Sequence, residues 1–79
     1  MTLAEALSIR VNELLKSKNI TPYRLSVLSG ISQTSISEIR HMRNKSVNLA
    51  TICEIAHAFN MDLSVFFNSP IFSYENITD

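Results

Sequence analysis

The side chains best suited to metal or covalent chemistry in this chain are Cys53 and His57, which are four positions apart. On a helix this spacing places both on one face. A structural zinc site needs four ligands, and the sequence offers no second pair at a suitable spacing. A nucleophilic cysteine would need an orienting third group and an oxyanion hole, for which there is no candidate. We therefore expect a core cysteine, a half-exposed histidine and no catalytic residue, metal, cofactor or small-molecule ligand.

The charged side chains are unevenly distributed, although the net charge is zero. The stretch from residue 10 to residue 45 contains all seven basic residues but only Glu13 and Glu38 as acids, which gives it a local charge of +5. The flanking segments sum to −5. Such a stretch is typical of a phosphate-binding face or of an ordinary solvated surface. Its basic residues are Arg10, Lys16, Lys18, Arg24, Arg40, Arg43 and Lys45.

The composition favours one small all-α domain. Of the 79 residues, 46% are apolar, which is enough for one compact core. One glycine and two prolines are too few for the turns of a many-stranded fold. A single cysteine cannot form an internal disulfide, and no secretory leader pattern is evident, so we expect a cytoplasmic protein. Its apolar runs fall far short of the ~20 residues that cross a bilayer, so no membrane contact is predicted.

Capping signals divide the chain into five helices. Thr2 and Glu5 form a capping-box pair that starts a first helix, which runs to about Lys18 and closes at a left-handed Asn19. It buries a stripe of leucine and valine side chains at helical spacing. A second helix begins at Pro22 after the capping residue Thr21. This helix is expected to bury Leu25 and Leu28, and it ends at Ser29-Gly30.

The remaining helices follow from the same signals. Ser32 caps a third helix that turns Ile36 and Ile39 inward, and residues 41–48 form an exposed polar loop. Asn48 caps a fourth helix, which stops near Asn60. Its expected buried positions are Leu49, Ile52, Cys53, Ala56 and Phe59. Asp62 caps a last short helix that turns Leu63, Phe66 and Phe67 inward and ends at Asn68-Ser69-Pro70.

Two short helices joined by a turn with glycine form a helix-turn-helix pattern. Over about residues 3–67, the chain closely resembles the phage-repressor type of helix-turn-helix domain, the Cro/C1 or XRE-like family. The features that carry the resemblance are Leu25, the turn Ser29-Gly30-Ile31-Ser32, Ile36 and Ile39, then Leu49, Ile52, Ala56 and the junction Asn60-Met61-Asp62-Leu63 ahead of an aromatic pair.

The resemblance implies a compact five-helix domain that binds double-stranded DNA as a homodimer on a near-palindromic operator. It also implies transcriptional control, which we take to be repression. The base-reading residues it implies are Gln33, Thr34, Ser37 and Glu38. Gln33 could form two hydrogen bonds with adenine, and the Thr34 methyl group could contact a thymine methyl group. Ser37 can donate or accept a hydrogen bond, and Glu38 could accept one from cytosine N4. The phosphate-binding residues it implies are Thr21, Ser32, Arg43, Asn44 and Lys45.

Departures from the family pattern and an alternative function remain. In relatives, the helix that corresponds to the third helix here reads the DNA and is called the recognition helix. The loop after it often contains glycine, where this chain has His41-Met42. The predicted domain covers residues 1–68, and residues 69–79 form a tail with its own apolar side. That tail either completes a dimer or partner interface or folds on its own domain. The alternative function is a protein-interaction module, such as an antitoxin or regulatory subunit, that uses the same fold.

Overall fold

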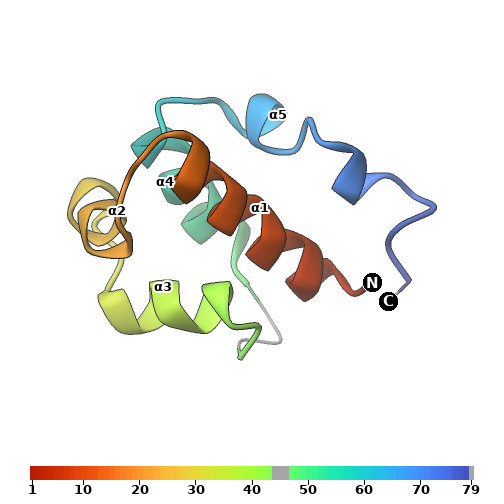
Figure 1. Cartoon of the computed structure of the whole chain (residues 1–79), viewed down its shortest axis with the longest axis horizontal. Helices are drawn as coiled ribbons and strands as arrows, with labels where there is room; N and C mark the ends of the chain where they lie inside the picture. The colour runs from red at the N-terminus through yellow and green to blue at the C-terminus, as the bar shows by residue number, and fades with distance from the viewer. Residues whose placement is uncertain (44–46, 79) are drawn as a thin grey trace.

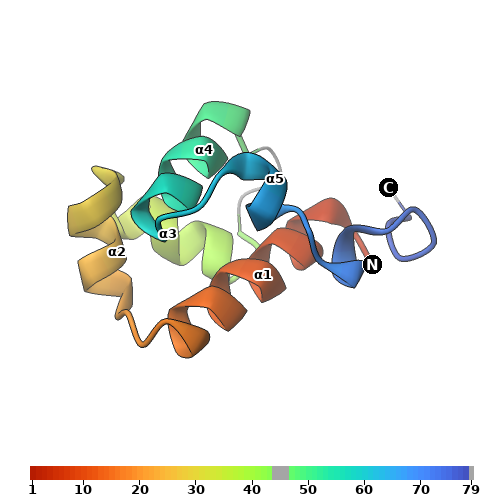
Figure 2. The ribbon, with the colours of Figure 1, turned by 90° about the horizontal axis from the view of Figure 1, so that it is seen from above.

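The computed structural model describes residues 1–43 and 47–78, and the regular secondary structure of this part of the chain is all helical, with no strand. The helix α1 crosses the middle of the molecule, with α3 along one side and α5 on the other (Figure 1). The view from above places α4 beyond α1 and α2 at one end (Figure 2). This confirms the predicted all-α fold of five helices. The elements are α1 (Leu3–Ser17), α2 (Pro22–Ser29), α3 (Gln33–Arg40), α4 (Leu49–Ala58), α5 (Leu63–Phe66) and a 3-10 turn η1 (Pro70–Phe72).

Side-chain caps start the first four helices where the sequence predicts them. The amide of Glu5 donates to Thr2 Oγ1, and the amide of Thr2 donates to Glu5 Oε1, each at 3.1 Å. At the start of α4, the amide of Ala50 donates to Asn48 Oδ1 at 2.7 Å. The prediction fails at α5, because Asp62 precedes this helix but its side chain makes no capping hydrogen bond. Each side-chain cap satisfies a backbone donor that the first helical turn leaves free.

Left-handed asparagines end two of the helical segments as predicted. Asn19 follows α1 with φ 54°, and Asn60 follows α4 with φ 61°. Asparagine tolerates this conformation better than most residues with a side chain. The ends of these two helices are therefore set by local residues, and the sequence alone predicts them.

One apolar core joins all five helices. The helix α1 contributes the longest stripe, and α4 contributes the next longest. Each of the short helices α2 and α5 contributes one fully buried side chain, and α3 contributes two. The core residues are Leu7, Val11, Leu14, Leu15, Leu25, Ile36, Ile39, Ile52, Ile55, Ala56, Phe59 and Phe66.

Five expected core positions are wrong or only partly buried. Leu28 is 45% exposed and Leu49, the first residue of α4, is 63% exposed. Half-buried are Cys53, Leu63 and Phe67. In α2, Leu28 is rotated by roughly 60° from Leu25, so only Leu25 faces inward fully.

Two buried apolar residues were missed. Ile55 is fully buried because it shares the inward face of α4 with Ile52 and Phe59. Ala6 of α1 is fully buried as well.

The tail folds on its own domain in this structure. The ring of Phe72 lies 5.0 Å from that of Phe67, nearly at right angles, and η1 packs against α1. The N-terminal ammonium donates to the carbonyl of Asn76 at 2.8 Å, and the amide of Thr78 donates to the carbonyl of Met1 at 2.9 Å. The two ends of the chain therefore lie side by side (Figure 1). The domain boundary after residue 68 stays a prediction.

In the described residues, no helix combines the length and the apolar character needed to cross a membrane.

The burial difference within α2 gives a direct test of the core. Replacing the fully buried Leu25 with alanine should lower the free energy of unfolding by about 2–5 kcal/mol, because it removes transfer energy and leaves a cavity. The matched control is Leu28→Ala, three residues away, which should cost less than about 1 kcal/mol. Urea denaturation followed by circular dichroism measures both. Equal losses for the two variants would contradict the observed orientation of α2.

Candidate nucleic-acid interface

The turn between α2 and α3 is fixed by one glycine and two serines. Gly30 has φ 76°, and a Cβ added there would meet nothing within 4 Å, so its backbone conformation and not lack of space favours glycine. Ser26 Oγ donates to the carbonyl of Ile31 at 2.6 Å. The amide of Ile31 donates to Ser29 Oγ at 3.2 Å. These bonds hold the start of α3 in one position relative to α2.

The inner face and the C-terminal end of α3 are bound to the rest of the domain. Ile36 and Ile39 are 1% and 4% exposed. At the last helical residue, the carbonyl of Arg40 accepts from Ser8 Oγ, and Arg40 Nε donates to Asn12 Oδ1 at 2.8 Å. We call this group of three residues, Ser8, Asn12 and Arg40, the α1–α3 clamp. It fixes the far end of α3 against α1.

The outer face of α3 carries the residues predicted to read bases. Gln33 and Thr34 are exposed, and Ser37 and Glu38 are half-buried. At 100° per residue, the last three fall within roughly 100° of one another, on the side opposite the two buried isoleucines. Gln33 lies at the edge of this face, in the first helical turn. The structure thus brings all four residues to one outward surface.

The predicted phosphate-binding residues lie in three different settings. Thr21 and Ser32 are exposed at the starts of α2 and α3, and each side-chain oxygen accepts a hydrogen bond from a backbone amide, at 3.1 Å. Arg43 is exposed just after α3, and its amide donates to the carbonyl of Glu38 at 2.9 Å. Asn44 and Lys45 lie outside the described residues.

Comparison with protein-family models matches residues 10–64 to the Cro/C1-type HTH DNA-binding domain. The chain belongs to this family. The match covers the helix-turn-helix and more than half of the chain, and it confirms the predicted resemblance. Comparisons with curated proteins and with solved structures gave no significant match.

In the loop after α3 of this Cro/C1-type domain, Met42 stands where relatives often have glycine, and its backbone conformation shows why glycine is common there. Met42 has φ 59°, in the left-handed region where glycine is the usual residue. The chain therefore keeps the turn with a residue that has a side chain. A methionine in this conformation costs of the order of 1–2 kcal/mol.

Within the described part of the Cro/C1-type domain, two basic side chains form hydrogen bonds to other parts of the fold and do not simply form part of an open basic face. Arg10 Nε donates to the carbonyl of Phe66 at 2.6 Å, and Arg10 Nη2 donates to the carbonyl of Val65 at 2.9 Å. The guanidinium also lies 5.8 Å from the ring centre of Phe66. Arg40 is held in the α1–α3 clamp. The local charge of the sequence stretch therefore overstates the number of cations available to a partner.

Sequence reasoning missed the residues that position α3. Ser8 is only 4% exposed, and Asn12 is half-buried beside it on α1. The available signal was a polar pair four residues apart within the apolar stripe of α1. Buried polar side chains of this kind are nearly always hydrogen-bonded, so the pair pointed to a specific partner.

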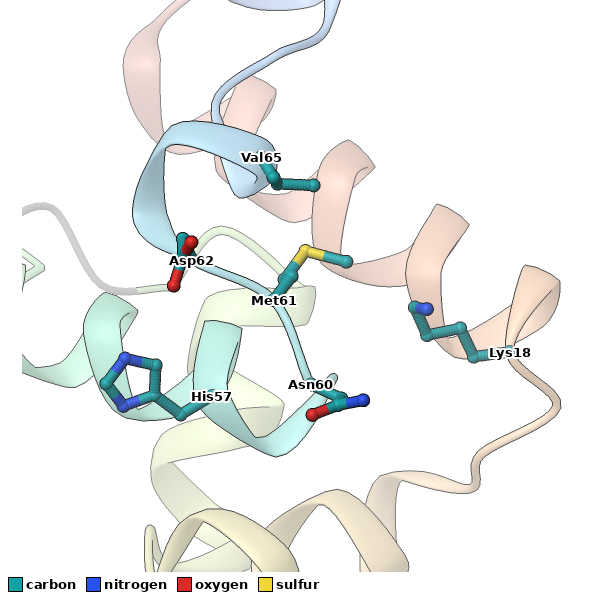
Figure 3. Close-up of a pocket in the computed structure, with 6 residues that line it drawn as sticks. All are labelled: Lys18, His57, Asn60, Met61, Asp62 and Val65. Carbon is teal, nitrogen blue, oxygen red and sulfur yellow. The ribbon is translucent and has the colours of Figure 1, made fainter.

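A concave surface of the Cro/C1-type domain, separate from the outer face of α3, lies between the ends of α1 and α4 and the start of α5. It is a shallow depression of about 470 Å³. Figure 3 shows its lining side chains spread around an open rim. They are Lys18, His57, Asn60, Met61, Asp62 and Val65.

The Cys–His pair of the sequence lies on the outer side of α4. The Sγ of Cys53 lies 3.7 Å from Nε2 of His57. Among the described residues, no group of three or more histidine, cysteine or acidic side chains is arranged to hold a metal ion. The pair thus has no third ligand within this part of the chain.

Proposed function

We propose that this protein is a sequence-specific DNA-binding regulator, acting as a cytoplasmic repressor, that inserts α3 into the major groove. The observation that supports this most strongly is the arrangement of α3. Its inner face is buried and its C-terminal end is held by the α1–α3 clamp, while Gln33 and Thr34 are exposed at its N-terminal end. A helix held in this way presents side chains to base edges at a fixed depth and angle.

The proposed base contacts follow from the donors and acceptors on the outer face. Gln33 forms two hydrogen bonds with one adenine, and the Thr34 methyl group contacts a thymine methyl group. Ser37 donates to or accepts from a base edge, and Glu38 accepts from cytosine N4. Of these residues, Gln33 is exposed and Glu38 is half-buried.

The proposed phosphate contacts flank this surface. The amides at the starts of α2 and α3, next to Thr21 and Ser32, lie at the positive ends of their helix dipoles and suit an anion. Arg43 supplies a full cation beyond the other end of α3. Asn44 and Lys45 belong to the same proposed set. These contacts set the register of the protein on the duplex and carry no base preference.

We further propose a homodimer on a near-palindromic operator. Tyr74 is 95% exposed in the tail, and Val65 is 48% exposed in α5. Apolar side chains at this exposure are available to a second copy of the chain. The tail is already held by its own domain through Phe72, so it can offer Tyr74 without first becoming ordered.

A protein-interaction module remains the second candidate. It is favoured by an exposed apolar pair on α2, where Tyr23 is 62% exposed and Val27 is 52% exposed one turn later. Pure interaction modules show no salt-dependent affinity for a duplex, whereas DNA-binding proteins do. Affinity for a duplex across a salt series therefore separates the two candidates.

Replacing Gln33 with alanine should weaken binding to the preferred operator by about 1–3 kcal/mol and relax base preference at one position per half-site. Binding to a scrambled duplex should hardly change, because Gln33 is assigned no phosphate contact. Fluorescence anisotropy on both duplexes measures the two affinities.

The matched variant is Arg43→Ala, which removes one cation per subunit. It should weaken binding to both duplexes and, for a dimer, reduce the slope of log affinity against log salt by roughly two units. The assigned roles are wrong if Gln33→Ala weakens both duplexes equally. They are also wrong if Arg43→Ala alters the preferred base and leaves the salt slope unchanged.

The dimer makes a geometric prediction. Two recognition helices related by a two-fold axis must enter successive major grooves on one side of the duplex, about 34 Å or roughly ten base pairs apart. Inserting about five base pairs between half-sites should place them on opposite sides and abolish cooperative binding. Unchanged affinity after the five-base-pair insertion would contradict a two-fold dimer.

A further inference from the structure

His41 lies on the outward face of α3, although it was not among the predicted DNA-binding residues. It is exposed and forms the C-terminal cap of the helix. At 100° per residue it falls between Thr34 and Ser37 in direction, opposite the buried isoleucines. It lies about 10 Å further along the helix axis than Thr34, since the rise is about 1.5 Å per residue. His41 therefore continues the proposed base-reading surface toward its far end.

The ring of His41 is held in one orientation by its own helix. Its Nδ1 lies 2.8 Å from the carbonyl oxygen of Ser37 and 3.4 Å from the Ser37 hydroxyl. A carbonyl only accepts, so Nδ1 carries the proton in this bond. The other ring nitrogen, Nε2, has no hydrogen-bond partner among the described residues. The imidazole thus offers one defined atom to a ligand.

We propose that His41 Nε2 donates a hydrogen bond to a DNA backbone phosphate at the edge of the major groove. This rests on the proposed function, in which α3 enters the groove. The groove is about 12 Å wide, so a side chain about 10 Å beyond Thr34 on the same face reaches its wall. Phosphate oxygens line that wall, and they only accept hydrogen bonds.

This contact requires a proton to be taken up from solution. With Nδ1 bonded to the Ser37 carbonyl, a neutral ring presents Nε2 as an acceptor, which phosphate cannot satisfy. Only the imidazolium donates from both nitrogens at once. Duplex binding is therefore coupled to protonation of His41, and affinity rises as the pH falls.

Few charged groups lie near His41 in the described part of the chain. On α3 and just after it, these groups are Glu38, Arg40 and Arg43, and Arg40 is bound in the α1–α3 clamp. The side chains of α1 that reach the end of α3 are the uncharged Ser8 and Asn12. The only charged residue of α2 is Arg24. Among the described residues, no ion pair holds the ring of His41.

The test measures affinity for a duplex between pH 5.5 and pH 8. Two probes are used: a mixed-sequence duplex of 20 base pairs, and a duplex selected from a random pool by the wild-type protein. A phosphate contact acts on both. Wild-type affinity should rise toward low pH by up to about tenfold per pH unit per subunit, the limit set by uptake of one proton. The variant His41→Ala should lose this dependence, and its affinity should match that of the wild type most closely at pH 8.

Two matched variants separate the ring nitrogens. His41→Gln places a neutral N–H donor near the position of Nε2, so it should keep affinity at pH 8 or raise it, with no pH dependence. His41→Asn places its amide near the position of Nδ1, so it keeps the bond to the helix and should behave like His41→Ala. His57→Gln on α4 controls for the other histidine and should leave the pH dependence unchanged. Circular dichroism at each pH checks that the variants are folded.

The possible outcomes differ for the contact and for the proposed function. If His41→Ala keeps the wild-type pH dependence, the phosphate contact is wrong. His41→Ala could instead change the preferred base of the selected duplex and leave the dependence of affinity on pH unchanged. In that case the residue reads a base and the proposal is overturned. If neither duplex binds, the proposed function fails and this contact fails with it. A pH-dependent His41 contact on the mixed-sequence duplex, with no duplex enriched from the pool, would uphold the contact and overturn sequence specificity.

Discussion

The attachment of α3 to α1 is the constraint on which the proposed DNA-binding surface depends. An isolated helix of eight residues is too short to be stable in water, so its existence and its direction come from tertiary contacts. Ile36 and Ile39 bury one face, and the α1–α3 clamp holds the last carbonyl and the side chain of Arg40. Together with the serine-locked turn before it, this attachment fixes both ends of α3. Its outer face then carries the exposed side chains of Gln33 and Thr34, which are available to a ligand.

The same need for external contacts explains the C-terminal side of the molecule. The helix α5 is only four residues long, and its last carbonyls would have no donor within the helix. Arg10 supplies two hydrogen bonds to these carbonyls from α1 and covers the ring of Phe66. The helix α1 therefore supports both short outer helices, α3 on one side and α5 on the other. A basic residue that looks available for DNA in the sequence instead holds the fold together.

The sequence predicted the helices well because their limits are set locally. The capping pair Thr2 and Glu5, the caps Thr21, Ser32 and Asn48, and the left-handed Gly30 act within three or four residues of their own positions. Burial was harder to predict. Leu25 and Leu28 have the same side chain in the same helix, and only the placement of neighbouring helices decides which of them is covered. The hydrogen bonds of Arg10 and Arg40 are made to partners 56 and 28 residues away. No local sequence pattern predicts such distant partners.

For the candidate site, the sequence predicted which residues of α3 face outward, but it did not predict the contacts with α1 that hold α3 in place. The positions of Gln33 and Thr34 follow from helical periodicity once the cap at Ser32 is recognised. Periodicity also puts His41 on this face, but the orientation of its ring depends on the hydrogen bond to the Ser37 carbonyl, which the sequence does not show. Ser8 and Asn12 could be recognised as unusual in an apolar stripe, but their partner could not be named. Helical periodicity thus predicts which residues share a face of α3. The contacts that fix the direction of that face join distant segments and are seen only in the structure.

The most direct measurement is a map of backbone amide chemical shifts, recorded by NMR while the protein is titrated with a duplex enriched from a random pool. If the outer face of α3 enters the major groove, the largest changes should fall on residues 33–38 and on the starts of α2 and α3. The amides around the depression of Figure 3, at the ends of α1 and α4, should change little. Changes centred on that depression or on the exposed face of α2, with α3 unaffected, would contradict DNA recognition through α3.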